Sequence, residues 1–131
     1  MLEPSILTPP VESPDATLDP NSLARLAVGL ASDKKAEDIL MIDIHALSSI
    51  ADYFVICTGT SDRQVRAVAK EIQEQLRLHG ARPLHIEGME AANWVLLDYG
   101  AVIVHIFDPA TRDYYRLEKL WAEAPRVLVV Q

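Results

Sequence analysis

The sequence predicts a single α/β domain built from a mixed sheet of about five strands and three helices. Two apolar runs on either side of Asp98–Gly100 predict a β-hairpin, because a short loop containing glycine commonly joins antiparallel strands. Between residues 53 and 87, a strand-like run, a helical run and a second strand-like run predict a right-handed crossover and a parallel strand pair. A chain of 131 residues has the length of one domain and can bury a hydrophobic core. We expect this domain to span residues 19–124.

The first 18 residues contain four prolines and no lysine or arginine, which predicts a disordered or loosely attached acidic tail. They have neither the charged start and apolar core of a signal peptide nor the arginines of a transit peptide. No apolar run approaches the roughly 20 residues of a membrane helix, and the single cysteine permits no internal disulfide. These features predict a cytoplasmic protein without a membrane partner.

Residues Asp19–Ser22 predict the start of the first helix, because they combine capping side chains with an early proline. Apolar side chains then recur at helical spacing, at Leu23, Leu26, Ala27 and Leu30. Asp38–Ile44 and Tyr53–Cys57 predict strands, joined by the polar stretch His45–Asp52. Tyr53–Cys57 has no polar alternation, as expected for a central strand buried on both faces.

The second helix is the clearest local prediction. Ser61 is its N-cap, and Gln64 three residues later completes a capping box. Asp62 adds a negative charge that the helix dipole favours. The buried stripe is predicted at Val65, Val68, Ala69, Ile72 and Leu76. Gly80 is the expected residue after the helix end, and Pro83–Glu87 predicts the next strand.

The hairpin is predicted over Trp94–Phe107, with Asp98–Gly100 as its loop. In this register Leu97 pairs with Ala101. The side chains then divide between two faces, with Trp94, Leu96, Val102 and Val104 on one and Val95, Leu97, Ile103 and His105 on the other. Since both faces are apolar, we expect the hairpin to lie inside a sheet that is covered on both sides.

Thr111–Ala122 is predicted to form the third helix, which Pro125 ends. Its apolar stripe is Tyr114, Leu117, Leu120 and Trp121. The closing run Arg126–Gln131 is either a further edge strand or a frayed tail over residues 125–131. Three helices of about 10–12 Å width are too few to cover both faces of a sheet about 24 Å across. We therefore expect apolar sheet surface that a dimer or another partner covers.

The polar residues give little indication of catalysis. Thr58–Ser61 has the position of an anion-binding turn, but Asp62 would repel an anion, so an ordinary capped turn is favoured. The four histidines lack metal-ligand spacing, and Cys57 is expected to be inert packing. Carboxylates near strand ends suit either a site or turn capping, and capping is favoured, for Asp43, Asp52, Asp62, Glu87 and Asp98.

The net charge of −7 argues against sequence-specific nucleic-acid binding and favours a basic partner. Trp94 follows a loop and lies close to Asp98 and Tyr99 in the sequence. It is either a core tryptophan or an interface anchor, since tryptophan and tyrosine dominate binding energy where they are exposed. In the second case Asp98 would meet basic groups of the partner.

Four separated segments together resemble the ribosomal silencing factor family (Iojap-related), in the family's order and over about residues 23–121. They are LSSIADYFVICTGTSDRQV, IEG, WVLLDYGAVIVHIF and RDYYRLEKLW. The resemblance implies a small bacterial α/β protein, often a homodimer, that binds the large ribosomal subunit through large-subunit ribosomal protein fourteen. Bound there, such a protein blocks joining of the small subunit and represses translation when nutrients are short.

The resemblance also implies which residues make the contact. The positions that match the family's motifs, and are therefore expected on the contact surface, are Trp94, Asp98, Tyr99, Gly100, Ser48, Asp52, Arg63 and Glu87.

The family's fold also resembles that of nucleotidyltransferases, which leaves a residual nucleotidyltransferase or a nucleotide-binding protein as the alternative. Those enzymes use a Gly-Ser turn followed by a pair of metal-binding carboxylates on a strand. Here the turn is Gly59–Ser61, and the run Leu84–Glu87 carries a single carboxylate. We therefore expect a nucleotidyltransferase-like topology without the catalytic pair, no enzymatic activity, and no metal or cofactor.

Overall fold

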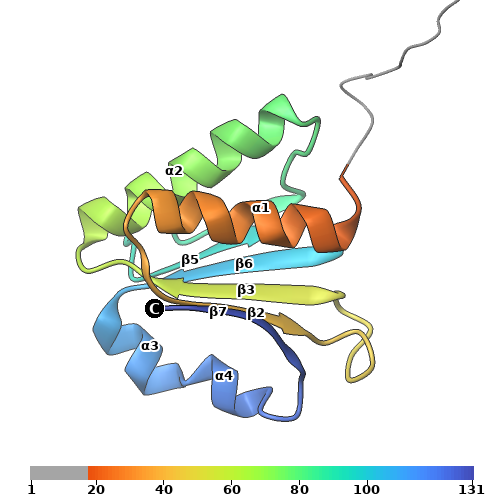
Figure 1. Ribbon diagram of the computed structural model, residues 1–131. Coiled ribbons are helices and arrows are strands. Elements are labelled where there is room, and N and C mark those ends of the chain that lie inside the picture. The colour runs from red at the N-terminus through yellow and green to blue at the C-terminus, as the bar shows by residue number, and fades with distance from the viewer. Residues whose placement is uncertain (1–17) are drawn as a thin grey trace, which may run out of the picture.

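The computed structural model describes residues 18–131 as three layers, with a six-stranded sheet between two layers of helices (Figure 1). α1 (Pro20–Asp33) and α2 (Asp62–Leu78) pack together on one face, and α3 (Pro109–Tyr115) and α4 (Leu117–Leu120) lie on the other. This confirms the predicted α/β domain with a mixed sheet. The tail predicted over residues 1–18 lies outside the described residues, except for Leu18.

The sheet has six strands where about five were predicted. They are β2 (Glu37–Asp43), β3 (Tyr53–Thr58), β4 (His85–Glu87), β5 (Trp94–Asp98), β6 (Val102–Phe107) and β7 (Arg126–Val130). Their order across the sheet is β4-β5-β6-β3-β2-β7. Among these described strands β3 and β6 are parallel neighbours, and the other neighbouring pairs are antiparallel. The sixth strand is β7, so the C-terminal run forms an edge strand rather than a frayed end.

Capping side chains begin the first two helices at the predicted positions. Asp19 Oδ1 accepts a hydrogen bond from the N–H of Ser22 at 2.8 Å, and Ser61 Oγ accepts one from the N–H of Gln64 at 3.1 Å. The Gln64 side chain accepts from the N–H of Thr60 at 2.6 Å, so the capping box closes on the residue before the N-cap. The buried side chains of α2 are those predicted: Val65, Val68, Ala69, Ile72 and Leu76.

The parallel pair predicted for the two strands around α2 does not form. Within the described sheet β4 pairs with β5 alone, at the edge, while β6 takes the place beside β3. All three residues of β4 are exposed, which suits an edge, whereas all six residues of β6 are buried and need a strand on each side. The crossover through α2 therefore passes over β6 and β5 before β4 begins.

The hairpin register differs from the prediction by three residues. Leu97 pairs with Val104 rather than with Ala101. Asp98 remains in β5, and its Oδ1 accepts a hydrogen bond from the N–H of Gly100 at 2.7 Å, so the turn begins one residue later. When the register shifts by an odd number of residues, the side chains of one strand that shared a face with a given set on the other strand now lie on the opposite face. The face that carries Trp94 and Leu96 therefore includes Ile103, His105 and Phe107.

The third predicted helix is divided into α3 and α4. Arg116 lies between them with a φ of 48°, in the left-handed region, and its N–H donates to the carbonyl of Arg112 to end α3. The break separates the predicted apolar stripe. Leu117 is buried, whereas Tyr114 and Leu120 are 81% and 75% exposed.

The two faces of the sheet are covered to different extents. The layer of α1 and α2 covers one face, and its core extends from β2 across to β5. On the other face α3 and α4 cover the centre, where Phe54, Ile56 and Phe107 are buried. Coverage stops at β5, where Trp94 and Leu96 are half-buried. The uncovered apolar surface expected from the number of helices lies at two edges of this face: Trp94 and Leu96 at the β5 end, and Val129 of β7, which is 53% exposed and pairs with Leu40, at the other.

Candidate functional site

Three of the predicted contact residues lie together at the β4–β5 edge of the sheet, on the face that α3 and α4 cover only in part. Strand pairing places His85 opposite Asp98 and Glu87 opposite Leu96. Trp94, Leu96 and Asp98 alternate along β5 and therefore point to the same side. We call this surface the β4–β5 face: His85, Glu87, Trp94, Leu96 and Asp98.

The indole of Trp94 lies at one end of the β4–β5 face and is fixed by the residues behind it. Its Nε1–H donates to Nδ1 of His105 at 3.2 Å. The indole ring packs against the rings of Phe107 and Tyr115, with 4.9 Å between ring centroids in each pair. Trp94 is half-buried, so part of the ring is held while another part stays accessible. A side chain that is already fixed loses little conformational entropy when a partner binds it.

His105 supports Trp94 from the interior of the sheet. The residue is 4% exposed, and burial lowers its pKa to about 3, so the ring is neutral at pH 7. Because Nδ1 accepts the indole N–H, the proton of the neutral ring is assigned to Nε2. Nε2 is buried and has no partner among the described residues, and the ring also packs edge-on against Phe54 at 4.6 Å between centroids.

Carboxylates border the apolar centre of the β4–β5 face. Glu87 Oε2 lies 2.5 Å from Nε2 of His85, and both side chains are more than half exposed. Asp98 Oδ1 accepts from the N–H of Gly100, so this carboxylate also shapes the hairpin turn. The face therefore presents an apolar strip, Trp94 and Leu96, with acidic groups beside it.

The remaining predicted contact residues lie elsewhere. Tyr99 packs toward the core beneath α1 and α2, and burial raises the pKa of its phenol to about 12. Gly100 forms the hairpin turn with a φ of 88°. Ser48 and Asp52 belong to the connection between β2 and β3, and the N–H of Asp52 donates to the carbonyl of Ala101 at 2.7 Å, next to the same turn.

Arg63 is the predicted contact residue that is separated most clearly from Trp94. It is exposed in the first turn of α2, in the helical layer on the opposite side of the sheet from α3 (Figure 1). The structure thus brings Trp94, Asp98 and Glu87 onto one face, places Ser48 and Asp52 beyond the Asp98 end, and leaves Arg63 on the other side.

Three residues that support or extend the surface did not emerge from sequence reasoning. Leu96 is predicted in the sheet interior, Tyr115 falls outside the predicted helical stripe, and His105 is predicted only to lack the spacing of a metal ligand. The sequence gives no signal for Tyr115, because no side chain of α3 is buried and the left-handed Arg116 at its end decides how α3 lies on the sheet. Only the strand register places His105 beneath Trp94.

The turn at Thr58–Ser61 is a capped helix start. Three of its N–H donors are occupied internally. The N–H of Thr60 donates to Gln64 Oε1, that of Gln64 to Ser61 Oγ, and that of Arg63 to Asp62 Oδ1. A phosphate would have to displace these acceptors and lie beside the Asp62 carboxylate. This arrangement supports the capped-turn interpretation over an anion site.

Other candidate chemical groups have structural surroundings. Cys57 is fully buried in β3, and burial raises the pKa of its thiol to about 12. Within residues 18–131 no three His, Cys, Asp or Glu side chains are grouped so that they could hold a metal ion. The helices in this part of the chain include none with the length and apolar character to cross a membrane.

Comparison with known proteins gives a consistent family assignment. Residues 17–131 match the family model described as "Ribosomal silencing factor during starvation". The ribosomal silencing factor RsfS of Bacillus subtilis is 46% identical over 108 residues, which cover 82% of this chain and 92% of that protein. A mouse protein named "Mitochondrial assembly of ribosomal large subunit protein 1" is 34% identical over 99 residues, covering 73% of this chain and 43% of its own length.

Solved structures agree with the sequence relatives. A crystal structure from Chromobacterium violaceum superposes with a TM-score of 0.78 at 38% identity, covering 80% of this chain and 88% of that one. A crystal structure from Bacillus halodurans gives a TM-score of 0.73 at 42% identity, with 82% and 98% covered.

Proposed function

Because the chain belongs to the ribosomal silencing factor family, we propose that it represses translation by binding the large ribosomal subunit and blocking the small subunit from joining. The contact on the large subunit is large-subunit ribosomal protein fourteen. The protein acts in the bacterial cytoplasm, chiefly during starvation or stationary phase. Family membership supports the association with ribosomes, and the β4–β5 face supports the mode of contact.

The observation that carries this proposal is the half-buried Trp94 on an open, acid-bordered sheet face. The indole is fixed by His105 and Tyr115 but remains accessible, as interface anchors are. Glu87 and Asp98 beside it favour basic groups. A net charge of −7 opposes direct binding to ribosomal RNA, so a basic ribosomal protein is the better partner.

The contact extends along the face from Trp94 toward the hairpin turn. Asp98 and Gly100 end this path, and the backbone of Asp52 joins the turn through Ala101. A partner that covers the β4–β5 face can therefore also meet the connection that carries Ser48 and Asp52. Arg63 is not part of this contact, because it lies in the helical layer over the opposite face of the sheet.

The test is binding to purified large subunits together with a subunit-joining assay. Trp94→Ala should weaken binding by about thirtyfold or more, the effect of losing a hot-spot anchor, and should restore joining. Glu87→Lys and Asp98→Lys should each weaken binding through charge. Tyr114→Ala is the matched control, since Tyr114 is an aromatic residue of α3 that is 81% exposed and outside the face.

Folding of each variant is checked by circular dichroism and urea unfolding. Asp98→Asn separates charge from turn geometry, because the amide oxygen can still accept from Gly100. If folded Trp94→Ala and Glu87→Lys variants inhibit joining as well as the unmodified protein, the β4–β5 face is not the contact.

We also propose that the free protein forms a homodimer through this same apolar strip. The strip is apolar sheet surface that the protein's own helices leave open, and a second copy would cover it. Trp94→Ala should then shift sedimentation toward the monomer, and large subunits should compete with self-association. A dimer that persists unchanged in Trp94→Ala would place self-association on another surface.

A further inference from the structure

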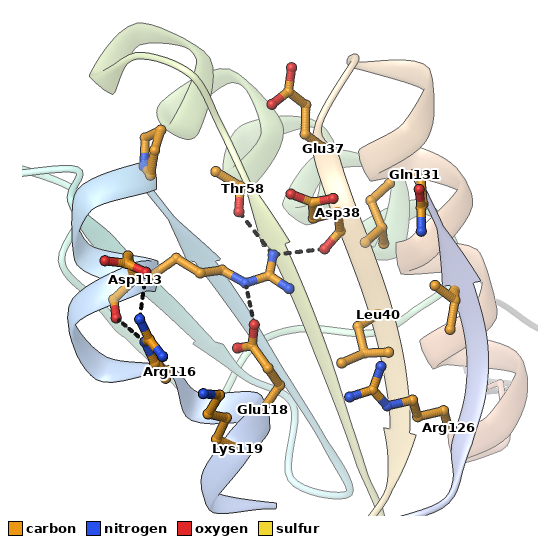
Figure 2. A pocket seen from close by; sticks show the side chains of 14 residues that line it. Glu37, Asp38, Leu40, Thr58, Asp113, Arg116, Glu118, Lys119, Arg126 and Gln131 are labelled. Atoms are coloured by element: carbon orange, nitrogen blue, oxygen red, sulfur yellow. Dashed lines mark hydrogen bonds and ion pairs between the residues drawn. The ribbon is translucent and has the colours of Figure 1, made fainter. Parts of the chain in front are cut away.

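An open pocket of about 570 Å³ lies on the other side of α3, away from the β4–β5 face (Figure 2). It lies at the carboxyl end of β3, next to the end of β6. From these two parallel neighbours the chain leaves in opposite directions, from β3 to α2 on one face and from β6 to α3 on the other. The pocket adjoins this reversal, a place where α/β sheets commonly bind ligands, and extends from it along β2 and β7.

The guanidinium of Arg112 is fixed at the centre of this pocket. Its side chain is only 12% exposed. Nη1 donates to the carbonyl of Asp38 at 2.7 Å and to Thr58 Oγ1 at 2.8 Å, and Nε donates to Glu118 Oε2 at 3.2 Å. The remaining nitrogen, Nη2, has no partner among residues 18–131. An arginine held in this way keeps one donor available without any cost of ordering it.

Other groups around the pocket are also without partners. Lys119 and Arg126 are exposed, line the pocket, and take part in no ion pair within the described chain. Oε1 of Glu118 is buried and accepts no hydrogen bond in this part of the protein. A buried acceptor without a donor is costly, so a donor from a ligand or a water would stabilise it.

The pocket carries charges of both signs. Figure 2 shows Glu37 and Asp38 toward one end and Lys119 and Arg126 toward the other, with the carboxylate of Glu118 beside Lys119. The cationic end suits an oxyanion, while the acidic end and Glu118 suit hydroxyl or amino donors. The volume exceeds that of an isolated phosphate ion and lies in the range of small-molecule sites.

We propose that this pocket binds a small organic anion, whose phosphate or carboxylate group contacts Arg112, Lys119 and Arg126. Hydroxyl or amino groups of the same molecule face Glu37 and Asp38. The site is separate from the β4–β5 face, because none of these residues belongs to that face.

The experiment titrates the full chain with ribose 5-phosphate and, separately, with citrate, and follows the Nε–H signal of Arg112 and the backbone signals of Asp38 and Thr58 by NMR. Saturable shifts confined to this region are expected with at least one probe. Saturation by ribose 5-phosphate alone assigns a phosphate ligand, saturation by citrate alone assigns a carboxylate ligand, and saturation by both assigns a general oxyanion site.

Substitution separates a built site from weak surface charge. Combining Lys119→Ala with Arg126→Ala should weaken the apparent affinity about tenfold or more, as expected for the loss of charge-assisted contacts. Lys70→Ala is the control, an exposed lysine of α2 outside the pocket. Absence of saturation by both probes up to about 10 mM, or equal affinity in the double variant and the control, overturns the proposal.

Discussion

His105 shows how a buried residue determines the behaviour of an exposed one. Its Nδ1 accepts the Trp94 indole N–H, and this is possible only while that nitrogen carries no proton. Burial lowers the pKa of His105 to about 3, so the neutral ring persists through the whole physiological range. The orientation of the indole is therefore insensitive to physiological pH.

The same lowered pKa predicts how stability depends on acid. Between about pH 6.5 and pH 3 the unfolded chain protonates this histidine while the folded chain does not, so the stability it contributes falls as the pH falls. The slope from one such group is at most about 1.4 kcal/mol per pH unit. Urea unfolding at several pH values should show a shallower slope for His105→Phe than for the unmodified protein.

His45 provides an internal comparison for that experiment. The hydrogen bond that the His45 ring donates to the Asp43 carboxylate raises the pKa of His45, so its stabilising contribution is present at low pH and is lost as the pH rises through the raised pKa. The unmodified protein and the His105→Phe variant both contain His45, so its contribution is the same in each and cancels when their pH slopes are compared. Identical slopes for His105→Phe and the unmodified protein would contradict the assignment of a neutral buried His105.

Gly88 and Gly100 form a matched pair for a prediction about the backbone. Both have positive φ, 87° and 88°, so alanine is strained at either position. A Cβ on Gly88 would lie 2.0 Å from the carbonyl oxygen of Trp94, whereas one on Gly100 would meet only Leu84 Cδ1 at 3.5 Å. Gly100→Ala should cost about 1 kcal/mol, and Gly88→Ala at least about 3 kcal/mol, because a backbone clash is added to the strain. Chemical unfolding measures both, and equal losses would contradict this explanation.

At the scale of elements, α3 is attached to the sheet mainly through Arg112. Its hydrogen bonds join the helix to the irregular start of β2 at Asp38, to the end of β3 at Thr58, and to Glu118 of α4. No side chain of α3 is buried, so packing alone holds this helix weakly. The position of α3 matters for the β4–β5 face, because α3 supplies Tyr115 to Trp94.

Arg112→Leu should destabilise the protein by about 2–3 kcal/mol, since it removes charge-assisted bonds and leaves the Glu118 carboxylate without its partner. Arg116→Leu is the control: its ion pair with Asp113 is exposed, and its loss should change stability by less than about 0.5 kcal/mol. Urea unfolding compares the two. Equal effects would show that Arg112 is no more important to α3 than a surface ion pair.

At the scale of the whole molecule, the sheet separates the expected contact residues into two groups. Glu87 and Trp94 point to the open face, while Arg63 lies in the helical layer beyond the opposite one. A partner that lies flat on the β4–β5 face does not reach both. Arg63→Ala should therefore leave binding to large subunits within about twofold of the unmodified protein, whereas Trp94→Ala weakens it strongly. Equal losses would require a partner that wraps around the sheet edge at β4.

The sequence alone determined the kinds of element and where the main helices begin. Ser61 and Gln64 define the start of α2 because capping involves groups only a few residues apart. The spacing of apolar residues similarly identified the buried side of that helix. The family's motifs added the ribosomal expectation and named Trp94, Asp98 and Glu87, which the structure places on one face.

The tertiary structure decided which strands are neighbours, the hairpin register and the break at Arg116. These depend on competition between segments far apart in the chain: β6 displaces β4 from the side of β3 because only β6 is buried on both faces. A shift of three residues in the hairpin, with Asp98 kept in β5, moved His105 beneath Trp94. Local preferences act over one or two turns, so they cannot choose among registers that differ only in what is buried across the sheet.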